Sequence, residues 1–339
     1  TQSGTTTIAA AGDIISDGAV TISSGGGTTT SADVTTTADA IQFASATGLG
    51  DAVALVSAGG AVTFTSTLDN AQNLTITAAA GNVSFSGAVG GSTRLGTLNI
   101  VTAGDVTAGA LTLAAFDQDA GTGTTTLGGA VDTNAAGGVV VANTNLAVNA
   151  AVTTTGNGVV TFTQSGTTTI AAAGNIVSDG AVTVTSGGGT TTSADVTTTR
   201  DVIEFASNTA VNADLTLNTT SGGAAGAAIT FGGNITNGGA NDLILVAGTG
   251  GAITVAGTTA VTDLTLTSGA SAVFTGNVTV NDLITASTAT TITLNGAANT
   301  FVEAIDFVNT GTVTLGNATG DQSTFASGLD FSGNAPLAL

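Results

Sequence analysis

Short apolar–polar–apolar triplets recur along the whole chain, separated by stretches rich in Gly, Ala, Thr, Asn and Asp. Residues 62–64 (VTF), 74–76 (LTI) and 83–85 (VSF) are typical. Alternation with a period of two residues is typical of a β-strand that buries one face. The glycines and asparagines between triplets favour turns, and no segment has the spacing and capping residues of a helix. We therefore expect an all-β protein of many short strands.

The spacing of the phenylalanines indicates how these strands repeat. Phe43, Phe64 and Phe85 follow one another at steps of 21 residues, and Phe301 lies 24 residues before Phe325. A step of this size fits one coil of a β-solenoid, in which equivalent side chains of successive coils stack as an internal ladder. We predict that eleven phenylalanines belong to this core ladder: Phe43, Phe64, Phe85, Phe162, Phe205, Phe231, Phe274, Phe301, Phe307, Phe325 and Phe331.

The predicted fold is a right-handed parallel β-solenoid, or β-helix, with coils of about 21–24 residues. Neighbouring coils would then pair in register at a spacing of about 4.8 Å. Tandem β-sandwich domains are the alternative, because short strands at this spacing fit both architectures. Sandwich domains usually place Trp or Tyr in the core. The chain has neither residue, and its one proline is Pro336, so the solenoid is favoured.

A long internal repeat underlies the short one. Residues 1–45 return at 163–207 with 38 of the 45 positions identical. We expect one continuous solenoid over residues 1–339, with repeats at 1–162 and 163–324 of about seven coils each, and a further unit starting at 325–339. Because the chain opens within a repeat, we interpret it as a mature or excised segment of a longer protein.

The balance of charges excludes several classes of function. The only basic side chains are Arg94 and Arg200, against 22 acidic residues, and the net charge is −20. Binding to nucleic acid or to an anionic membrane surface needs clustered Lys and Arg, so we expect neither. No apolar run reaches the roughly 18 residues of a membrane span. The absence of Cys excludes disulfides and thiolate metal sites.

Two carboxylates are the best candidates for catalysis. A glycosidase needs two carboxyl groups that face a sugar cleft. Asp117 and Asp119 lie two residues apart, so an extended strand would place both on the same side. The simpler interpretation is a solvated acidic loop. We expect that the protein is not an enzyme, with polysaccharide cleavage as a less favoured alternative.

Calcium is the one cofactor that the sequence suggests. Residues 238–245 (GGANDLIL) are similar to a single glycine- and aspartate-rich repeat of calcium-binding bacterial toxins, with Asn241 and Asp242 as the candidate ligands. Such sites form between stacked repeats, and this segment occurs once. We therefore expect no cofactor, with calcium as the alternative, and interpret the segment as a turn that leads into a strand.

Runs of threonine raise a further possibility. Residues 5–7, 28–30 and 190–192 are each TTT, and the last such run ends at Thr199. Flat arrays of outward threonines on a β-solenoid can bind ice, but they need the same pair in every coil. Because the runs stop at Thr199, we expect ice binding less than the ordinary role of threonine as a β-forming residue on an outer face.

The texture of residues 73–77 (NLTIT), 81–91 and 272–278 resembles the giant β-strand-repeat proteins of bacterial surfaces, the filamentous-haemagglutinin-like adhesins and autotransporter passengers. This resemblance implies an extracellular structural rod or filament segment on the bacterial cell surface, and no catalytic residues. The expected partner is another copy of the chain, through end-to-end stacking or lateral bundling, or else the chain is cut from a giant fibre. The alternative is an adhesin that binds glycans or a host or neighbouring-cell surface.

Overall fold

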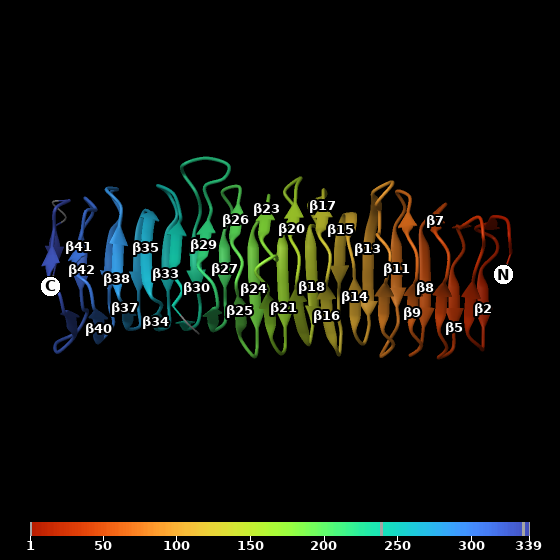
Figure 1. Ribbon diagram of the computed structural model, residues 1–339, viewed down its shortest axis with the longest axis horizontal. Coiled ribbons are helices and arrows are strands. Elements are labelled where there is room, and N and C mark those ends of the chain that lie inside the picture. Colours follow the sequence, from red (N-terminus) through yellow and green to blue (C-terminus); the bar gives the residue numbers. More distant parts are fainter. Residues whose placement is uncertain (1, 238–239, 334–335, 339) are drawn as a thin grey trace. The chain divides into compact units, whose positions relative to one another are not determined.

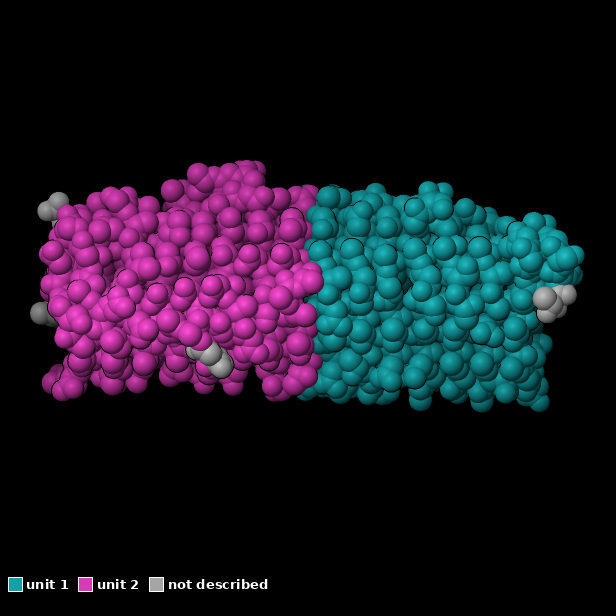
Figure 2. Space-filling view, in the orientation of Figure 1, with its two compact units in different colours: residues 1–166 teal, residues 167–339 magenta. Residues whose placement is uncertain are grey.

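The computed structural model describes residues 2–237, 240–333 and 336–338, and every regular element in these residues is a β-strand. The chain divides into two compact units, Thr1–Gly166 and Thr167–Leu339 (Figure 2). Within each unit short strands pair in parallel with the equivalent strands of neighbouring coils (Figure 1). Both units are parallel β-solenoids, and together they hold about 16 turns. The predicted fold class is confirmed, the sandwich alternative is wrong, and the hand of the coil stays a prediction.

Each coil consists of three short strands joined by turns. In one coil of the first unit these are β7 (Thr47–Leu49), β8 (Val53–Ser57) and β9 (Val62–Phe64). The first and third residues of β9 are buried and the central Thr63 is only partly so, as period-two alternation predicts. A coil of this size cannot enclose its apolar side chains, so each coil depends on its neighbours for a core.

The first unit has three faces, which we call A, B and C. Face A contains β1 (Thr6–Ile8), β4 (Thr28–Thr30), β7, β10 (Leu68–Asp69), a single bridging residue Val89, the first half of β15 (Leu111–Gln118), β17 (Val131–Thr133) and β20 (Val152–Thr154). Face B contains β2 (Ile14–Ser16), β5 (Val34–Thr36), β8, β11 (Leu74–Thr77), β13 (Leu95–Thr102), the second half of β15, β18 (Val139–Asn143) and β21 (Val160–Gln164). Face C contains β3 (Val20–Ile22), β6 (Ile41–Phe43), β9, β12 (Val83–Phe85), β14 (Val106–Ala108), β16 (Thr124–Leu127) and β19 (Asn145–Val148).

The second unit also has three faces, which we call D, E and F. Face D contains β22 (Thr168–Ile170), β25 (Thr190–Thr192), β28 (Thr209–Val211), β31 (Ile235–Asn237), β34 (Thr259–Ala260), β37 (Val278–Val280), β40 (Ala298–Phe301) and β43 (Gln322–Phe325). Face E contains β23 (Ile176–Ser178), β26 (Val196–Thr198), β29 (Leu215–Asn218), β32 (Leu243–Val246), β35 (Asp263–Ser268), β38 (Asp282–Thr285), β41 (Ile305–Asp306) and β44 (Leu329–Asp330). Face F contains β24 (Val182–Ser186), β27 (Ile203–Phe205), β30 (Ile229–Phe231), β33 (Ala252–Val255), β36 (Ser271–Phe274), β39 (Thr291–Leu294), β42 (Val313–Leu315) and β45 (Leu337–Ala338).

The coils vary in length more than the sequence suggested. On face C, Val20, Ile41, Val62 and Val83 follow at the expected step of 21 residues. Elsewhere the step between paired residues falls to 18, as from 95 to 113, and rises to 28, as from 215 to 243. Surface loops absorb such differences at small cost, because the entropy of closing a loop grows slowly with its length.

The phenylalanine ladder lies inside the coils. The rings of Phe43 and Phe64 stack with their centroids 5.0 Å apart, and those of Phe64 and Phe85 with theirs 5.4 Å apart. Three further stacked pairs are Phe205–Phe231, Phe301–Phe325 and Phe307–Phe331. In-register pairing of parallel strands imposes this stacking, because it places equivalent side chains directly above one another.

Three phenylalanines refine the predicted ladder. Phe162 and Phe274 are fully buried, but their in-register neighbours are Val141 and Val255 rather than other rings. Phe116 was absent from the predicted set, and it is also fully buried, between Leu98 and Val139 of the adjacent coils. It escaped the spacing argument because β15 belongs to two faces at once, so Phe116 follows no constant step.

Candidate functional site

Four aspartates stand in register in four consecutive coils of the second unit. These are Asp214, Asp242, Asp263 and Asp282, which we call the acidic ladder. Each comes directly before a buried leucine that enters a strand of face E. The inward leucine fixes the position of the aspartate at the corner of the coil, so the four carboxylates form a line with about 4.8 Å between neighbouring chains.

Backbone hydrogen bonds hold the ladder together. The N–H of Asp242 donates to Asp214 Oδ1 at 3.0 Å, and that of Asp263 donates to Asp242 Oδ1 at 3.2 Å. The N–H of Asp282 donates to Asp263 Oδ1 at 3.2 Å. Each carboxylate therefore satisfies a main-chain donor of the next coil at a place where the chain turns.

The close spacing of like charges affects how the ladder titrates. Burial raises the pKa of Asp242, and the carboxylates of Asp263 and Asp214 raise it further. Burial also raises the pKa of Asp282, with added repulsion from Asp263 and Glu303. Both groups therefore hold their protons to a higher pH than an ordinary aspartate, because their charged forms are less well solvated and face other negative charges.

The sequence singled out one step of this ladder and missed the rest. Asp242 is a ladder residue, whereas the amide nitrogen of Asn241 donates to the carbonyl of Val211 and to Asn237 Oδ1 and so ties the corner together. The signal that would have revealed the ladder is the dipeptide Asp-Leu, which recurs at 214, 242, 263 and 282. In the described residues no three acidic side chains converge on one point as a metal site would require, and calcium at Asn241 and Asp242 stays a prediction.

Asp117 and Asp119 belong to the first unit, at and just beyond the end of β15. Asp117 is partly exposed, and the inward Gln118 separates it from the exposed Asp119. Burial raises the pKa of Asp117, and the carboxylate of Asp119 adds to that effect. Asn99 lies in register with Asp117 on the next coil, and its buried Oδ1 has no hydrogen-bond partner among the described residues.

A surface hollow of about 370 Å³ lies beside Asp119. Asp119, Gly121, Asn143, Thr163, Gln164 and Ser165 contribute to its lining. Asn143 and Gln164 are almost fully buried, at 7% and 2% exposure, although both are polar. We call this feature the β15 hollow. No sequence pattern indicated it, because its residues come from three different coils.

The threonine runs divide between the core and the surface. In β4, Thr28 and Thr30 are buried and only Thr29 faces outward, and in β25, Thr190 and Thr192 are likewise buried. The inward hydroxyls bond to one another, as between Thr28 Oγ1 and Ser45 Oγ at 3.1 Å. These triplets therefore present one outward threonine per strand, and not the outward pair that an ice-binding array needs.

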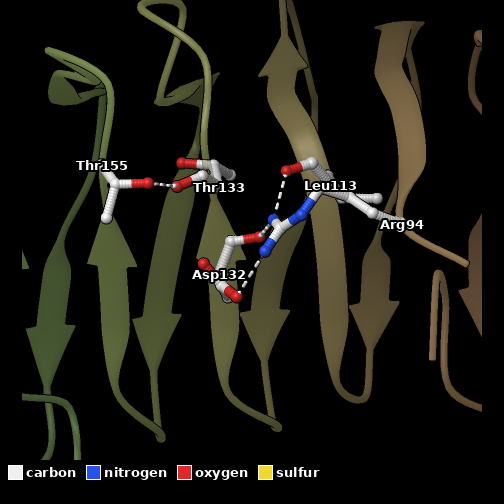
Figure 3. Close-up of polar contacts among 5 residues, drawn as sticks. All are labelled: Arg94, Leu113, Asp132, Thr133 and Thr155. Carbon is white, nitrogen blue, oxygen red and sulfur yellow. Dashed lines mark hydrogen bonds and ion pairs between the residues drawn. The ribbon is translucent and has the colours of Figure 1, made fainter. Parts of the chain in front are cut away.

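Arg94 forms a clamp across neighbouring coils of the first unit (Figure 3). Its Nη1 donates to the carbonyl of Leu113 at 2.7 Å and to that of Asp132 at 2.9 Å, and its Nη2 bonds Asp132 Oδ2 at 2.7 Å. The clamp lies where face A is reduced to the single bridging residue Val89. In the part of the chain that the structure describes, it is the only ion pair between side chains.

No protein-family model matches the chain, and comparisons with curated proteins and with solved structures found no match. The structure supports a β-helix repeat protein, and the resemblance to bacterial surface repeat proteins rests on the repeat pattern alone. Among the described residues, no helix has the length and apolar character needed to cross a membrane.

Proposed function

We propose that this chain is a structural segment of an extracellular rod or filament on a bacterial surface. The observation that carries the proposal is the in-register stacking of parallel coils in each unit, with apolar ladders inside. Such a fold gains length by adding coils, and each added coil repeats the same local contacts. Adhesin or autotransporter-passenger membership, and a single continuous solenoid over residues 1–339, are parts of this proposal.

The chain's own copies are the partner that the proposal favours. Parallel strands at the end of a solenoid present unpaired N–H and C=O groups, which recruit further strands. A head-to-tail contact of this kind does not close on itself, so it produces a filament. Lateral bundling is opposed by the net charge of −20, and divalent cations or low pH would promote it by reducing the repulsion.

Electron microscopy and fibre diffraction of the purified chain test the proposal. We expect elongated particles or filaments whose axial repeat is about 4.8 Å. Adding Ca²⁺ or lowering the pH should increase lateral bundling, as measured by light scattering. Separate rounded beads joined at variable angles, with scattering that ignores both treatments, would contradict the proposal.

Adhesion is the second candidate, and one observation favours it. A binding protein needs a surface feature that departs from the regular coil, and the β15 hollow is such a feature. Comparing the adhesion of coated beads to cells for the wild-type chain and for a variant altered at the hollow would separate the two functions. A rod without adhesive function would give equal, background adhesion for both.

A further inference from the structure

The β15 hollow contains two buried polar groups whose hydrogen-bonding capacity the fold does not use. Gln118 is fully buried, and its Oε1 accepts from Thr125 Oγ1 at 2.6 Å, but its Nε2 has no partner among the described residues. The Nδ2 of Asn143 donates to the carbonyl of Asn145 at 2.6 Å, whereas its Oδ1 has no partner in that part of the chain. An unpaired buried donor and an unpaired buried acceptor each cost stability, so a ligand that pairs with both would recover that cost.

Gly121 places both amides at the floor of the hollow. A Cβ atom at this position would lie 2.6 Å from Gln118 Nε2 and 2.9 Å from Asn143 Cβ. The absence of a side chain therefore leaves the amides covered by only a thin layer of main chain. Above them, Asp119, Thr163 and Ser165 add a carboxylate and two hydroxyls to the lining.

The chemistry of this lining selects the ligand. A donor and an acceptor side by side suit a hydroxyl group, which both accepts and donates a hydrogen bond. The carboxylate of Asp119 and the lack of any cationic side chain in the lining disfavour anions, and the N–H of Gln118 disfavours a metal ion. The apolar part of the lining is limited to small residues such as Ala142, which disfavours lipids and aromatic ligands.

We propose that the β15 hollow binds a neutral saccharide, whose hydroxyl groups pair with Gln118 Nε2, Asn143 Oδ1 and the carboxylate of Asp119. The volume of about 370 Å³ falls within the range of small-molecule sites. The site goes beyond the structural role and does not depend on it, because the hollow lies entirely within the first unit. Failure of filament formation would therefore leave the saccharide site intact, and loss of the site would leave the rod intact.

Titration of the ¹⁵N-labelled full chain tests this proposal directly. The probes are lactose, maltose, cellobiose and N,N′-diacetylchitobiose, each to 50 mM, and the readout is the side-chain amide signals of Gln118 and Asn143. We expect saturable shifts of these signals with at least one disaccharide. The variant Asp119→Asn should weaken binding by about tenfold, because it removes a charged hydrogen-bond acceptor.

Matched control variants test whether the shifts arise from binding in the hollow. Asp51→Asn removes a charge from an exposed carboxylate that bonds only to the neighbouring Ala52 N–H, and it should leave binding unchanged. Gly121→Ala should abolish binding, and Gly18→Ala, whose Cβ would meet no atom within 4 Å, should not. If Gly121→Ala fails to fold, Asp119→Asn carries the test alone. Silence of both amide signals with all four sugars, equal binding of digalacturonate, or shifts caused by CaCl₂ alone would each overturn the proposal.

Discussion

The two units manage the negative charge of the chain in different ways. In the first unit Asp132 meets the guanidinium of Arg94, which also bonds two main-chain carbonyls. In the second unit the acidic ladder of Asp214, Asp242, Asp263 and Asp282 has main-chain N–H groups as partners and carboxylates as neighbours. One unit therefore contains a neutralised pair, and the other a line of like charges that only backbone dipoles offset.

The corner device itself is common to both units. The N–H of Asp33 donates to Asp13 Oδ1 at 3.1 Å, and that of Ala54 donates to Asp33 Oδ1 at 2.8 Å, on face B of the first unit. There the series ends at an alanine after two acids, whereas the second unit repeats it in four consecutive coils. The comparison teaches that a carboxylate suits this corner as a hydrogen-bond acceptor, and that repetition alone turns it into an electrostatic burden.

The largest effect is expected in the core, where the charges play no part. Phe64→Ala removes a buried ring that stacks on both Phe43 and Phe85, and should cost about 3–5 kcal/mol of unfolding free energy. Denaturant unfolding followed by circular dichroism measures this loss. A loss below about 1 kcal/mol would show that the ladder contributes little and that the charges set the difference between the units.

Removal of the clamp comes next. Arg94→Met keeps most of the side-chain length but leaves Asp132 without its cation, and should destabilise the first unit by about 1 kcal/mol. The expected loss is modest because both side chains are partly exposed, at 30% and 46%, and solvent screens the pair. Arg200→Met in the second unit is the matched control and should change the melting temperature little. Equal effects of the two substitutions would contradict the role of the clamp.

Relief of repulsion in the ladder should have a smaller effect of opposite sign. Asp263→Asn keeps an oxygen acceptor for the N–H of Asp282 and removes the central charge, so it should stabilise the chain at pH 7 by about 0.5 kcal/mol. The pKa values of Asp242 and Asp282 should both fall, as measured by carbon-detected NMR titration. Unchanged pKa values would show that burial alone raises them.

The same ladder fixes the sign of the pH dependence. Because folding raises the pKa of Asp242 and Asp282, the folded state binds protons more tightly than the unfolded state. Their contribution to stability is therefore greatest below the unfolded pKa and is lost as the pH rises through the folded pKa. In Asp263→Asn this acid stabilisation should shrink, and the melting temperature measured across pH 3–7 checks it.

The smallest effect concerns a carboxylate of the second unit with the opposite behaviour. Hydrogen bonds from the hydroxyl and N–H of Ser332 lower the pKa of Asp306. Its contribution is present above the unfolded pKa and is lost as the pH falls through the folded pKa. Ser332→Ala should raise the pKa of Asp306 toward its ordinary value, while Ser327→Ala, which affects a different bond, should leave it unchanged. An unchanged pKa in Ser332→Ala would show that the hydroxyl is not its cause.

The sequence by itself determined the fold class and most of the core. Alternation within a triplet such as Val62–Phe64 depends on adjacent residues, and the steps that join Phe43, Phe64 and Phe85 stay constant because these coils have equal lengths. Stacking of identical units follows from these two local regularities. The prediction failed for Phe116, where one long strand serves two faces and the constant step is lost.

Only the tertiary structure decided which polar groups meet. Asp214 and Asp242 are 28 residues apart and Asp263 and Asp282 are 19 apart, yet all four stand at one corner, because loops of different length absorb the difference. The clamp joins residues 38 apart in sequence, and the β15 hollow combines three coils. Side-chain chemistry at a corner depends on the register between coils, and where coil length varies, that register is set by packing of the whole stack and not by any local pattern.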